Sequence, residues 1–230
     1  MYFMFSLNKC TVRACNNLAV STLDENGNLN EGKSYCLIHA PNPGKIQQDI
    51  INYIETHETI VGLNASSMAF SDIDISNKRF YGCNFMHCTF KNVHSKGFRS
   101  RMSMFDFSVF ADCNLIESNI LFTSFSGGTF SHTLFTGSDL IENNFNGISA
   151  FQSSFDDTDL YNSRFIKSKL INTSFRNCNL KKVLFYKHEL ENVSFKMSNT
   201  KEAVFEENGS QIYMDLDEAL KDNEQTGEIL

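Results

Sequence analysis

The stretch TDLYNSRFIKSKLINTSFRNCNL, residues 158–180, repeats one pattern every five residues. A Leu or Phe stands at each position whose number is divisible by five, from Leu160 to Leu180. Between Phe70 and Phe205 there are 28 such positions, here called centres, and 24 of them are Phe, Leu or Ile. A period of five matches neither a strand, with a period of 2, nor a helix, with 3.6. The pattern therefore predicts a chain that turns a corner every five residues and sends one side chain inward each time.

Two residues before each centre the side chain is usually small, and one residue before it is often Asn, Asp or Ser. This arrangement resembles the motif of the pentapeptide-repeat family, small-Asp/Asn-Leu/Phe-x-x, and the resemblance extends over 66–205. The resemblance implies an all-β solenoid, a right-handed quadrilateral β-helix of about seven coils, in which four pentapeptides form one square coil. Residues 20 apart would then stack on successive coils, about 4.8 Å apart.

A second period supports the square coil. Every centre of one 20-residue series is Phe, namely Phe85, Phe105, Phe125, Phe145, Phe165, Phe185 and Phe205. Another series avoids Phe in the body of the repeat and contains Ile120, Leu140, Leu160 and Leu180. A period of 20 superimposed on a period of five is what four-sided coils require.

Four centres break the pattern: Ser95, Ser100, Ala150 and Thr200. At the first three, the residue two positions earlier is large instead: Val93, Phe98 and Ile148. Both positions point inward in the implied fold, so the exchange conserves core volume. The alternative is a looped-out insertion over residues 91–104, and the sequence leaves both open. At Thr200 the residue two positions earlier is not large, and such a loss of core volume is expected where the regular solenoid ends.

The flanks of the repeat are predicted to close its ends, because an open coil exposes core and unpaired backbone. Pro43 begins a helical pattern that runs to about His57, with one apolar face formed by Ile46, Ile50, Tyr53 and Ile54. Near the C-terminus, Tyr213, Leu216 and Leu220 have helical spacing in an acidic tail. We expect two capping helices, the alternative being docking helices for a partner. The expected organisation is a zinc-binding lobe at 1–43, a capping helix and lead-in at 44–62, the β-helix at 63–208 and an acidic capping helix and tail at 209–230.

Cys10, Cys15, Cys36 and His39 have the spacing Cys-x4-Cys-x20-Cys-x2-His. Two close pairs joined by a long loop are typical of a tetrahedral Zn²⁺ site, and a turn signal at Asn26-Gly27 predicts a hairpin between them. Four protein ligands leave no position for water, so the predicted zinc is structural. The segment also resembles one found in some bacterial pentapeptide-repeat proteins. The alternative is three ordinary buried cysteines and an unrelated histidine.

The remaining cysteines, Cys83, Cys88, Cys113 and Cys178, all stand two residues before a centre, where Cys acts as a small hydrophobe. Histidines are scattered, with no carboxylate or nucleophile at a suggestive spacing. We therefore predict no catalytic residues, no organic cofactor and no enzymatic activity.

Charge distribution bears on the activity best known in the family, binding or inhibition of type II topoisomerase by an acidic rod that mimics DNA. Residues 66–205 carry 15 Lys/Arg against 13 Asp/Glu, whereas residues 206–230 carry 1 against 8. The acid is therefore concentrated in the tail, which disfavours DNA mimicry by the solenoid. No acid occurs between 160 and 188, a stretch with seven basic residues. These form either a patch for an acidic partner or an ordinary solvated surface.

The sequence thus predicts a non-enzymatic interaction or scaffold module with a protein partner. Outward aromatic residues are few beside the basic stretch, which argues against nucleic acid as the partner, and a homodimer is left open. Seven cysteines, an odd number, favour a soluble protein of a reducing cytoplasm, and no apolar run is long enough to predict a membrane span. DNA mimicry and a delivered bacterial effector that uses the rod for targeting are the alternatives.

Overall fold

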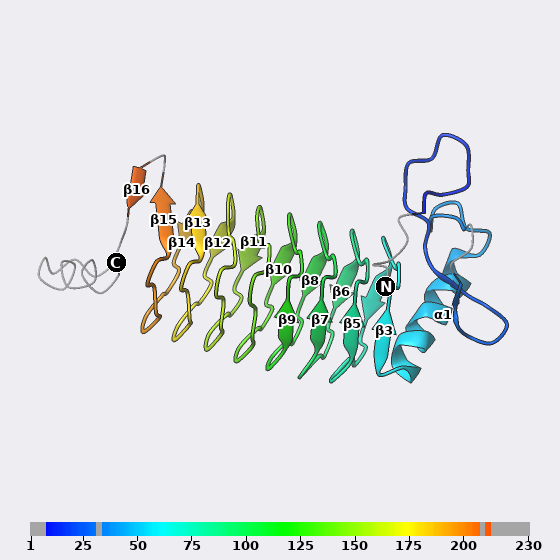
Figure 1. Cartoon of the computed structure of the whole chain (residues 1–230), viewed down its shortest axis with the longest axis horizontal. Helices are drawn as coiled ribbons and strands as arrows, with labels where there is room; N and C mark the ends of the chain where they lie inside the picture. The colour runs from blue at the N-terminus through cyan, green and yellow to red at the C-terminus, as the bar shows by residue number, and fades with distance from the viewer. Residues whose placement is uncertain (1–7, 31–33, 208–209, 213–230) are drawn as a thin grey trace, which may run out of the picture.

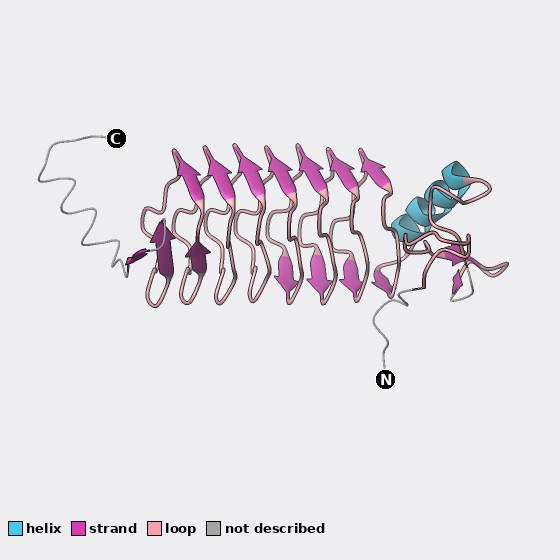
Figure 2. Cartoon of the chain, turned by 90° about the horizontal axis from the view of Figure 1, so that it is seen from above, coloured by secondary structure: helices cyan, strands magenta, loops and turns pink. Residues whose placement is uncertain are grey.

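The computed structural model describes residues 8–30, 34–207 and 210–212. They form a rod of stacked coils, with a helix and a small lobe at the N-terminal end (Figures 1 and 2). The capping helix expected around Tyr213, Leu216 and Leu220 lies outside the described residues. Within the described part, no helix is long and apolar enough to cross a membrane.

Each coil has four sides, named here after the four centres that follow residue 158: the Leu160, Phe165, Leu170 and Phe175 faces. The Leu160 face contains β3 (Thr59–Val61), β5 (Arg79–Tyr81), β7 (Arg99–Arg101) and β9 (Asn119–Leu121). The Leu170 face contains β4 (Ala69–Ser71), β6 (Thr89–Lys91), β8 (Val109–Ala111), β10 (Thr129–Ser131), β11 (Ser149–Phe151), β12 (Lys169–Ile171) and β14 (Glu189–Glu191). The Phe165 face ends in β13 (Leu184–Tyr186), β15 (Val204–Glu207) and β16 (Ser210–Ile212).

Strands of successive coils pair in parallel, and each centre lies opposite the equivalent centre of the next coil, as in Phe130↔Ala150 and Ala150↔Leu170. Elsewhere the coils meet through single parallel bridges with the same offset, such as Asn144↔Arg164. The exception is β16, which turns back and pairs antiparallel with β15, placing Ile212 opposite Phe205. The predicted solenoid of about seven four-sided coils is confirmed.

The corners of the coils are made by the backbone at the second residue after each centre. All 29 of these residues from Gly62 to Glu202 have positive φ, the left-handed conformation that side chains with a Cβ disfavour. Gly, Asn or Asp, the residues best suited to it, occupy 15 of the 29 corners. One left-handed residue in five explains the period of the sequence physically.

The core is a set of stacked side-chain columns. Along the Phe165 face, ring centroids of successive Phe residues from Phe85 to Phe205 lie 4.9–5.1 Å apart. Rings of neighbouring faces meet edge to face, as between Phe145 and Phe155 at 5.8 Å. Phe125, Phe145 and Phe165 are at most 1% exposed, so the prediction that centres form the core is confirmed.

Residues 91–104 form a regular coil, and the looped-out alternative is wrong. The strand β7 pairs on both sides, with Ser100 opposite Phe80 and Ile120. Phe98 fills the space that a large centre would occupy, with its ring centroid 5.3 Å from that of Phe80. Ser95 and Ser100 are fully buried beside it. The core tolerates the exchanged positions because the summed volume is kept.

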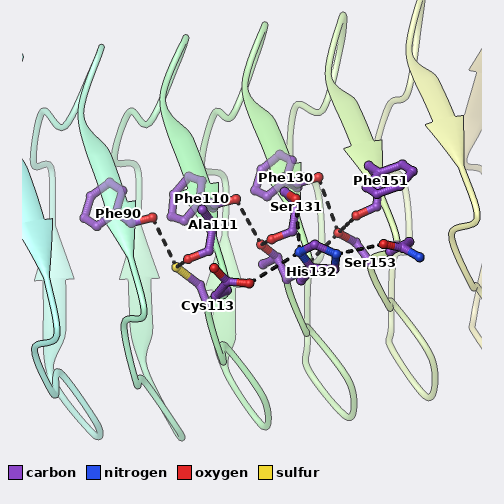
Figure 3. Close-up of polar contacts among 12 residues, drawn as sticks. Phe90, Phe110, Ala111, Cys113, Phe130, Ser131, His132, Phe151 and Ser153 are labelled. Carbon is purple, nitrogen blue, oxygen red and sulfur yellow. Dashed lines mark hydrogen bonds and ion pairs between the residues drawn. The ribbon is translucent and has the colours of Figure 1, made fainter.

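The small inward position has a second role, because its side chain joins successive coils by hydrogen bonds (Figure 3). Ser153 Oγ donates to the carbonyl of Phe130 at 3.5 Å and accepts from the amide of Thr133 at 3.2 Å. Cys113 Sγ donates to the carbonyl of Phe90 at 3.4 Å. These bonds satisfy buried polar groups, which explains why the position favours Ser, Thr and Cys over Ala.

Helix α1 (Pro43–Thr56) closes the N-terminal end, as predicted. Asn42 caps it by accepting from the amide of Lys45, and Ile50 and Ile54 are buried in the solenoid core. At its C-terminal end, Lys78 Nζ donates to the carbonyls of Glu55 and His57 at 2.6 and 3.0 Å. A cation at this end also suits the helix dipole.

Candidate metal centre

The predicted ligands Cys10, Cys15, Cys36 and His39 come together in the N-terminal lobe. A short antiparallel hairpin, β1 (Thr22–Leu23) and β2 (Leu29–Asn30), lies between the two pairs of ligands. Its tip is ordered by Asp24, whose carboxylate accepts from the amides of Asn26 and Asn28. The hairpin brings the second pair back to the first, and the turn predicted at Asn26-Gly27 is confirmed.

The four candidate ligand atoms lie within 4.8 Å of one another. His39 Nδ1 is 3.5 Å from Cys10 Sγ and 3.3 Å from Cys36 Sγ, and the sulfurs of Cys15 and Cys36 are 3.9 Å apart. A tetrahedral zinc with bonds of about 2.1–2.3 Å separates its ligand atoms by about 3.6–3.8 Å. The sulfurs are too far apart for a disulfide, which needs about 2.05 Å. The donor set and its spacing fit a four-coordinate zinc.

Neighbouring backbone groups hold these side chains in place. The amide of Cys10 donates to the carbonyl of Asn17 at 2.9 Å, and the amide of His39 donates to the carbonyl of Cys36 at 3.0 Å. Asn17 Nδ2 contacts Cys36 Sγ at 3.9 Å, a second contact of the kind that orients a metal ligand. Cys10 and Cys36 are buried, whereas His39 is exposed at the edge of the lobe.

Among the candidate ligands, the pKa values of Cys10 and Cys15 are shifted in opposite directions. Burial works to raise the pKa of Cys10, but backbone hydrogen bonds from Cys36 and Val12 and side-chain contacts with His39 and Cys36 lower it to about 6. For Cys15, a backbone hydrogen bond from Asn17 works to lower the pKa, but burial and the sulfurs of Cys36 and Cys10 raise it. Crowded sulfurs resist ionising together, and a divalent cation between them removes that penalty.

The lobe is attached to the first coil through the segment that precedes the hairpin. Ser21 donates its amide to the carbonyl of Asn64 at 2.7 Å and accepts at Oγ from the amide of Asn64 at 2.9 Å. The Asn64 side chain donates to the carbonyl of Ala19 at 2.5 Å. The candidate metal centre therefore braces the segment that satisfies the first free edge of the Phe165 face.

The four cysteines of the repeat are buried and free, as predicted. Burial raises the pKa of the Cys83 and Cys88 thiols to about 12, and it raises the pKa of Cys113 and Cys178 as well. Such thiols are protonated near neutral pH and are inert as nucleophiles.

One feature of the surface was missed by the sequence interpretation. Met102, Phe107 and Phe122 occupy corners, and each is 54–55% exposed. Met102 and Phe107 bound the Phe165 face on one coil, with half-buried Met104 between them, and Phe122 follows Met102 on the next coil. We call these four residues the apolar patch. The signal was present in the sequence: large apolar residues at a position where Gly, Asn and Asp prevail.

The repeat is also supported by comparison with known proteins. The family model described as "Pentapeptide repeat region" matches residues 129–205. No curated protein sequence matches this chain. Among solved structures the chain is similar to HetL of Nostoc sp. PCC 7120, a protein involved in heterocyst differentiation regulation. That pair shares 13% identity over 68% of this chain and 93% of HetL, with a TM-score of 0.26.

Two further solved structures are similar to the chain over most of their length. QnrB1, a plasmid-mediated fluoroquinolone resistance protein, shares 17% identity over 75% of this chain and 95% of its own, with a TM-score of 0.34. Rfr23 of the cyanobacterium Cyanothece 51142 shares 12% identity over 70% of this chain and 99% of its own, with a TM-score of 0.25. Residues 129–205 therefore match a pentapeptide-repeat region, and the same five-residue coil geometry continues along the rest of the rod.

Proposed function

We propose that this chain is a non-enzymatic interaction module whose solenoid binds a protein partner through the apolar patch. Met102, Phe107 and Phe122 are each more than half exposed and lie on two successive coils. Exposed apolar side chains that gather in one place mark interaction sites more often than single ones do. Large aromatic and Met side chains are also enriched at the centres of protein interfaces.

The backbone at the patch carries the proposal. Met102, Phe107 and Phe122 have φ of 49°, 58° and 52°, a conformation that costs about 1–2 kcal/mol for a residue with a bulky side chain. Asn or Gly, which occupy many other corners of the rod, would adopt this left-handed backbone conformation at a lower cost in free energy. Strain of this kind is retained where the side chain has a use, and side chains this exposed gain little from packing inside the protein.

Phe107 is also held in a fixed position before any partner arrives. Its ring stacks on that of His87, with centroids 5.2 Å apart. On the other side it lies over Gly127, where an added Cβ would come within 2.6 Å of Phe107 Cδ1. A preplaced aromatic ring loses little entropy on binding, which favours its use as an anchor.

We further propose that Cys10, Cys15, Cys36 and His39 hold one structural Zn²⁺. The ligand spacing and the four-donor set support this proposal, because all four coordination positions would be filled and none left for a substrate. Bound zinc would cross-link a lobe of about 40 residues that is too small to build much core of its own. Elemental analysis of protein purified without added metal should find close to one zinc per chain. Protein without zinc, with all three thiols free, would contradict the assignment.

Partner binding is tested by affinity capture and isothermal titration with matched variants. Met102→Ser combined with Phe122→Ser should abolish capture of the partner retained by the parent protein, and titration of the purified partner should give the same ranking of affinities. The control is Phe151→Ser, which removes an aromatic ring that is 43% exposed on the Leu170 face. Equal capture by all three proteins would contradict the patch. Self-association measured in parallel distinguishes a homodimer from a different protein partner.

Two other functions remain as alternatives. A DNA mimic that binds type II topoisomerase requires a sustained acidic track, and the charge of the solenoid disfavours it. A delivered effector would use the same rod as a targeting module. Reduced buried thiols and a Cys-rich metal centre support our proposal of a reducing compartment such as the cytoplasm.

A further inference from the structure

The Leu160 face carries its charges in an ordered way. In each coil the residues directly before and after the centre point outward, so they form two columns along the rod. The column before the centre runs over five successive coils in register: Arg79, Arg99, Asn119, Asp139 and Asp159. Its charge changes from positive to negative across the neutral side chain in the middle.

The same division runs through the surrounding sequence. Residues 75–105 contain six basic residues and no acid, whereas residues 106–163 contain eight acidic residues and neither Lys nor Arg. On the Leu160 face the basic block covers β5 and β7, and the acidic block follows β9. This face lies on the side of the rod opposite the seven strands of the Leu170 face (Figure 2).

Within one chain these charges repel each other along the column. Arg99 lies opposite Arg79 on the neighbouring strand, and Asp139 lies opposite Asp159. Like charges at such positions destabilise a sheet. Neither Arg99 nor Asp139 forms an ion pair with any side chain that the structure describes, and the coils on both sides of these two residues are fully described. A surface of opposite charge would relieve both repulsions.

A second copy of this chain presents such a surface. A two-fold axis that lies in the plane of the face, along the strands at Asn119, reverses the order of the coils and leaves each column over itself. Arg99 then stands opposite Asp139 of the second copy, and Arg79 stands opposite Asp159 of the second copy. Each contact occurs twice, as in any interface with two-fold symmetry.

The column after the centres suits the same arrangement. Its residues on the same five coils are all half-buried, and they are Tyr81, Arg101, Leu121, Ile141 and Tyr161. The two-fold axis places Leu121 opposite itself and Tyr81 opposite Tyr161, so apolar side chains pack beside the charged column. Arg101 Nη1 donates to the carbonyls of Ser100 and Asn119 at 2.9 and 2.8 Å, which satisfies this guanidinium within its own chain.

We propose that two copies of this chain associate antiparallel through their Leu160 faces, with the two-fold axis at Asn119. Arg99 and Asp139 form the principal pair, because Arg79 already pairs with Glu58 at 3.1 Å. An unrelated partner would have to reproduce the same change of sign along its surface, whereas a second copy has it by symmetry. The apolar patch lies on the adjoining Phe165 face and shares only one corner with this face, so the inference does not rest on the proposed function.

Charge exchange between two variants tests the pairing. Sedimentation velocity of the full-length parent protein should show a dimer that weakens in about 1 M salt, where the Debye length is about 3 Å. Arg99→Asp and Asp139→Arg should each weaken self-association roughly a hundredfold, because each change brings like charges together twice. An equimolar mixture of the two variants should recover dimers with one copy of each, since the two altered side chains then face each other. Lys91→Asp, at an exposed lysine of the Leu170 face, should leave the dimer unchanged.

Thiol cross-linking locates the axis. Packed sheets lie about 10 Å apart, so two copies of a residue on the axis would be within reach of a short bismaleimide. Leu121→Cys should therefore give a link between two copies of residue 121, identified by peptide mapping with mass spectrometry. Tyr161→Cys should give no link between two copies of residue 161, because four coil spacings would separate them by about 19 Å along the rod.

Three results would overturn the proposal. The parent protein could sediment as a monomer at every concentration. The two charge variants could associate as the parent does, or their mixture could stay monomeric although circular dichroism shows both to be folded. Links could form through Tyr161→Cys and not through Leu121→Cys, which would place the contact in another register. None of these variants changes the apolar patch, so a failure here is distinct from a failure of the proposed function.

Discussion

At the residue scale, position within the five-residue repeat decides what a side chain contributes to stability. Phe145 is fully buried, and its ring stacks between Phe125 and Phe165 at centroid distances of 5.1 and 4.9 Å. Phe145→Ala should lower the free energy of unfolding by about 3–5 kcal/mol, because it leaves a void inside a column. Phe151→Ala, at a residue 43% exposed, should cost less than about 1 kcal/mol. Chemical denaturation compares the two, and equal costs would contradict the assignment of centres to the core.

Corner residues should respond in the opposite direction. Phe122 has a φ of 52° and is 55% exposed, so its ring gains little from burial while its backbone is strained. Phe122→Asn should raise the free energy of unfolding by about 1 kcal/mol, because Asn tolerates the left-handed conformation better. The same variant should weaken partner binding if the apolar patch is an interface. Loss of stability in thermal denaturation would show that the ring packs more than its exposure indicates.

At the scale of elements, the lobe and the solenoid should separate in their response to metal loss. The lobe hydrogen-bonds to the first coil through Ser21, Asn64 and Ala19 and packs Val20 against the core, whereas the coils contact one another along their whole length. Cys36→Ser, or chelation of the parent protein, should therefore speed hydrogen exchange in residues 8–30 and leave exchange on β10 to β12 unchanged. Cys113→Ser controls for the loss of a thiol outside the metal centre. Exchange that rises equally along the rod would mean that the lobe is needed for the whole fold.

Elements set by a local period could be predicted from the sequence. The stacked Phe column, the helix from Pro43 and the hairpin at Asn26-Gly27 each follow from a spacing or a turn signal. The coil around Ser100 could not be decided, because an exchange of large and small residues weakens the motif as an insertion would. The clustering of Cys10, Cys15, Cys36 and His39 followed from their spacing, whereas zinc itself stays a prediction. The apolar patch was missed because corners were given no role.

At the scale of the whole molecule, charge distribution sets which macromolecules the rod attracts. Residues 66–205 carry 15 basic and 13 acidic residues, and four of the basic residues, Lys96, Lys169, Lys181 and Lys182, form ion pairs between coils. The acidic residues Asp139 and Asp159 accept hydrogen bonds from Asn119 and Asn179 and form no continuous track. A groove that binds the phosphates of DNA is itself basic, so it should not favour this rod.

We therefore expect weak inhibition of DNA gyrase or none. The exposed basic residues Arg164, Lys167 and Lys187, which lie on the Phe165 face and its corner, should be repelled by an enzyme groove that attracts phosphate. Supercoiling assays with the full-length protein at two salt concentrations check this expectation, with charge reversal at Lys167 and Lys187 as the matched variant. If the expectation holds, reversal should bring at most a small gain in inhibition. Salt-sensitive inhibition by the parent protein at low micromolar concentration would contradict it, and the acidic residues between 139 and 159 would then be the surface to test.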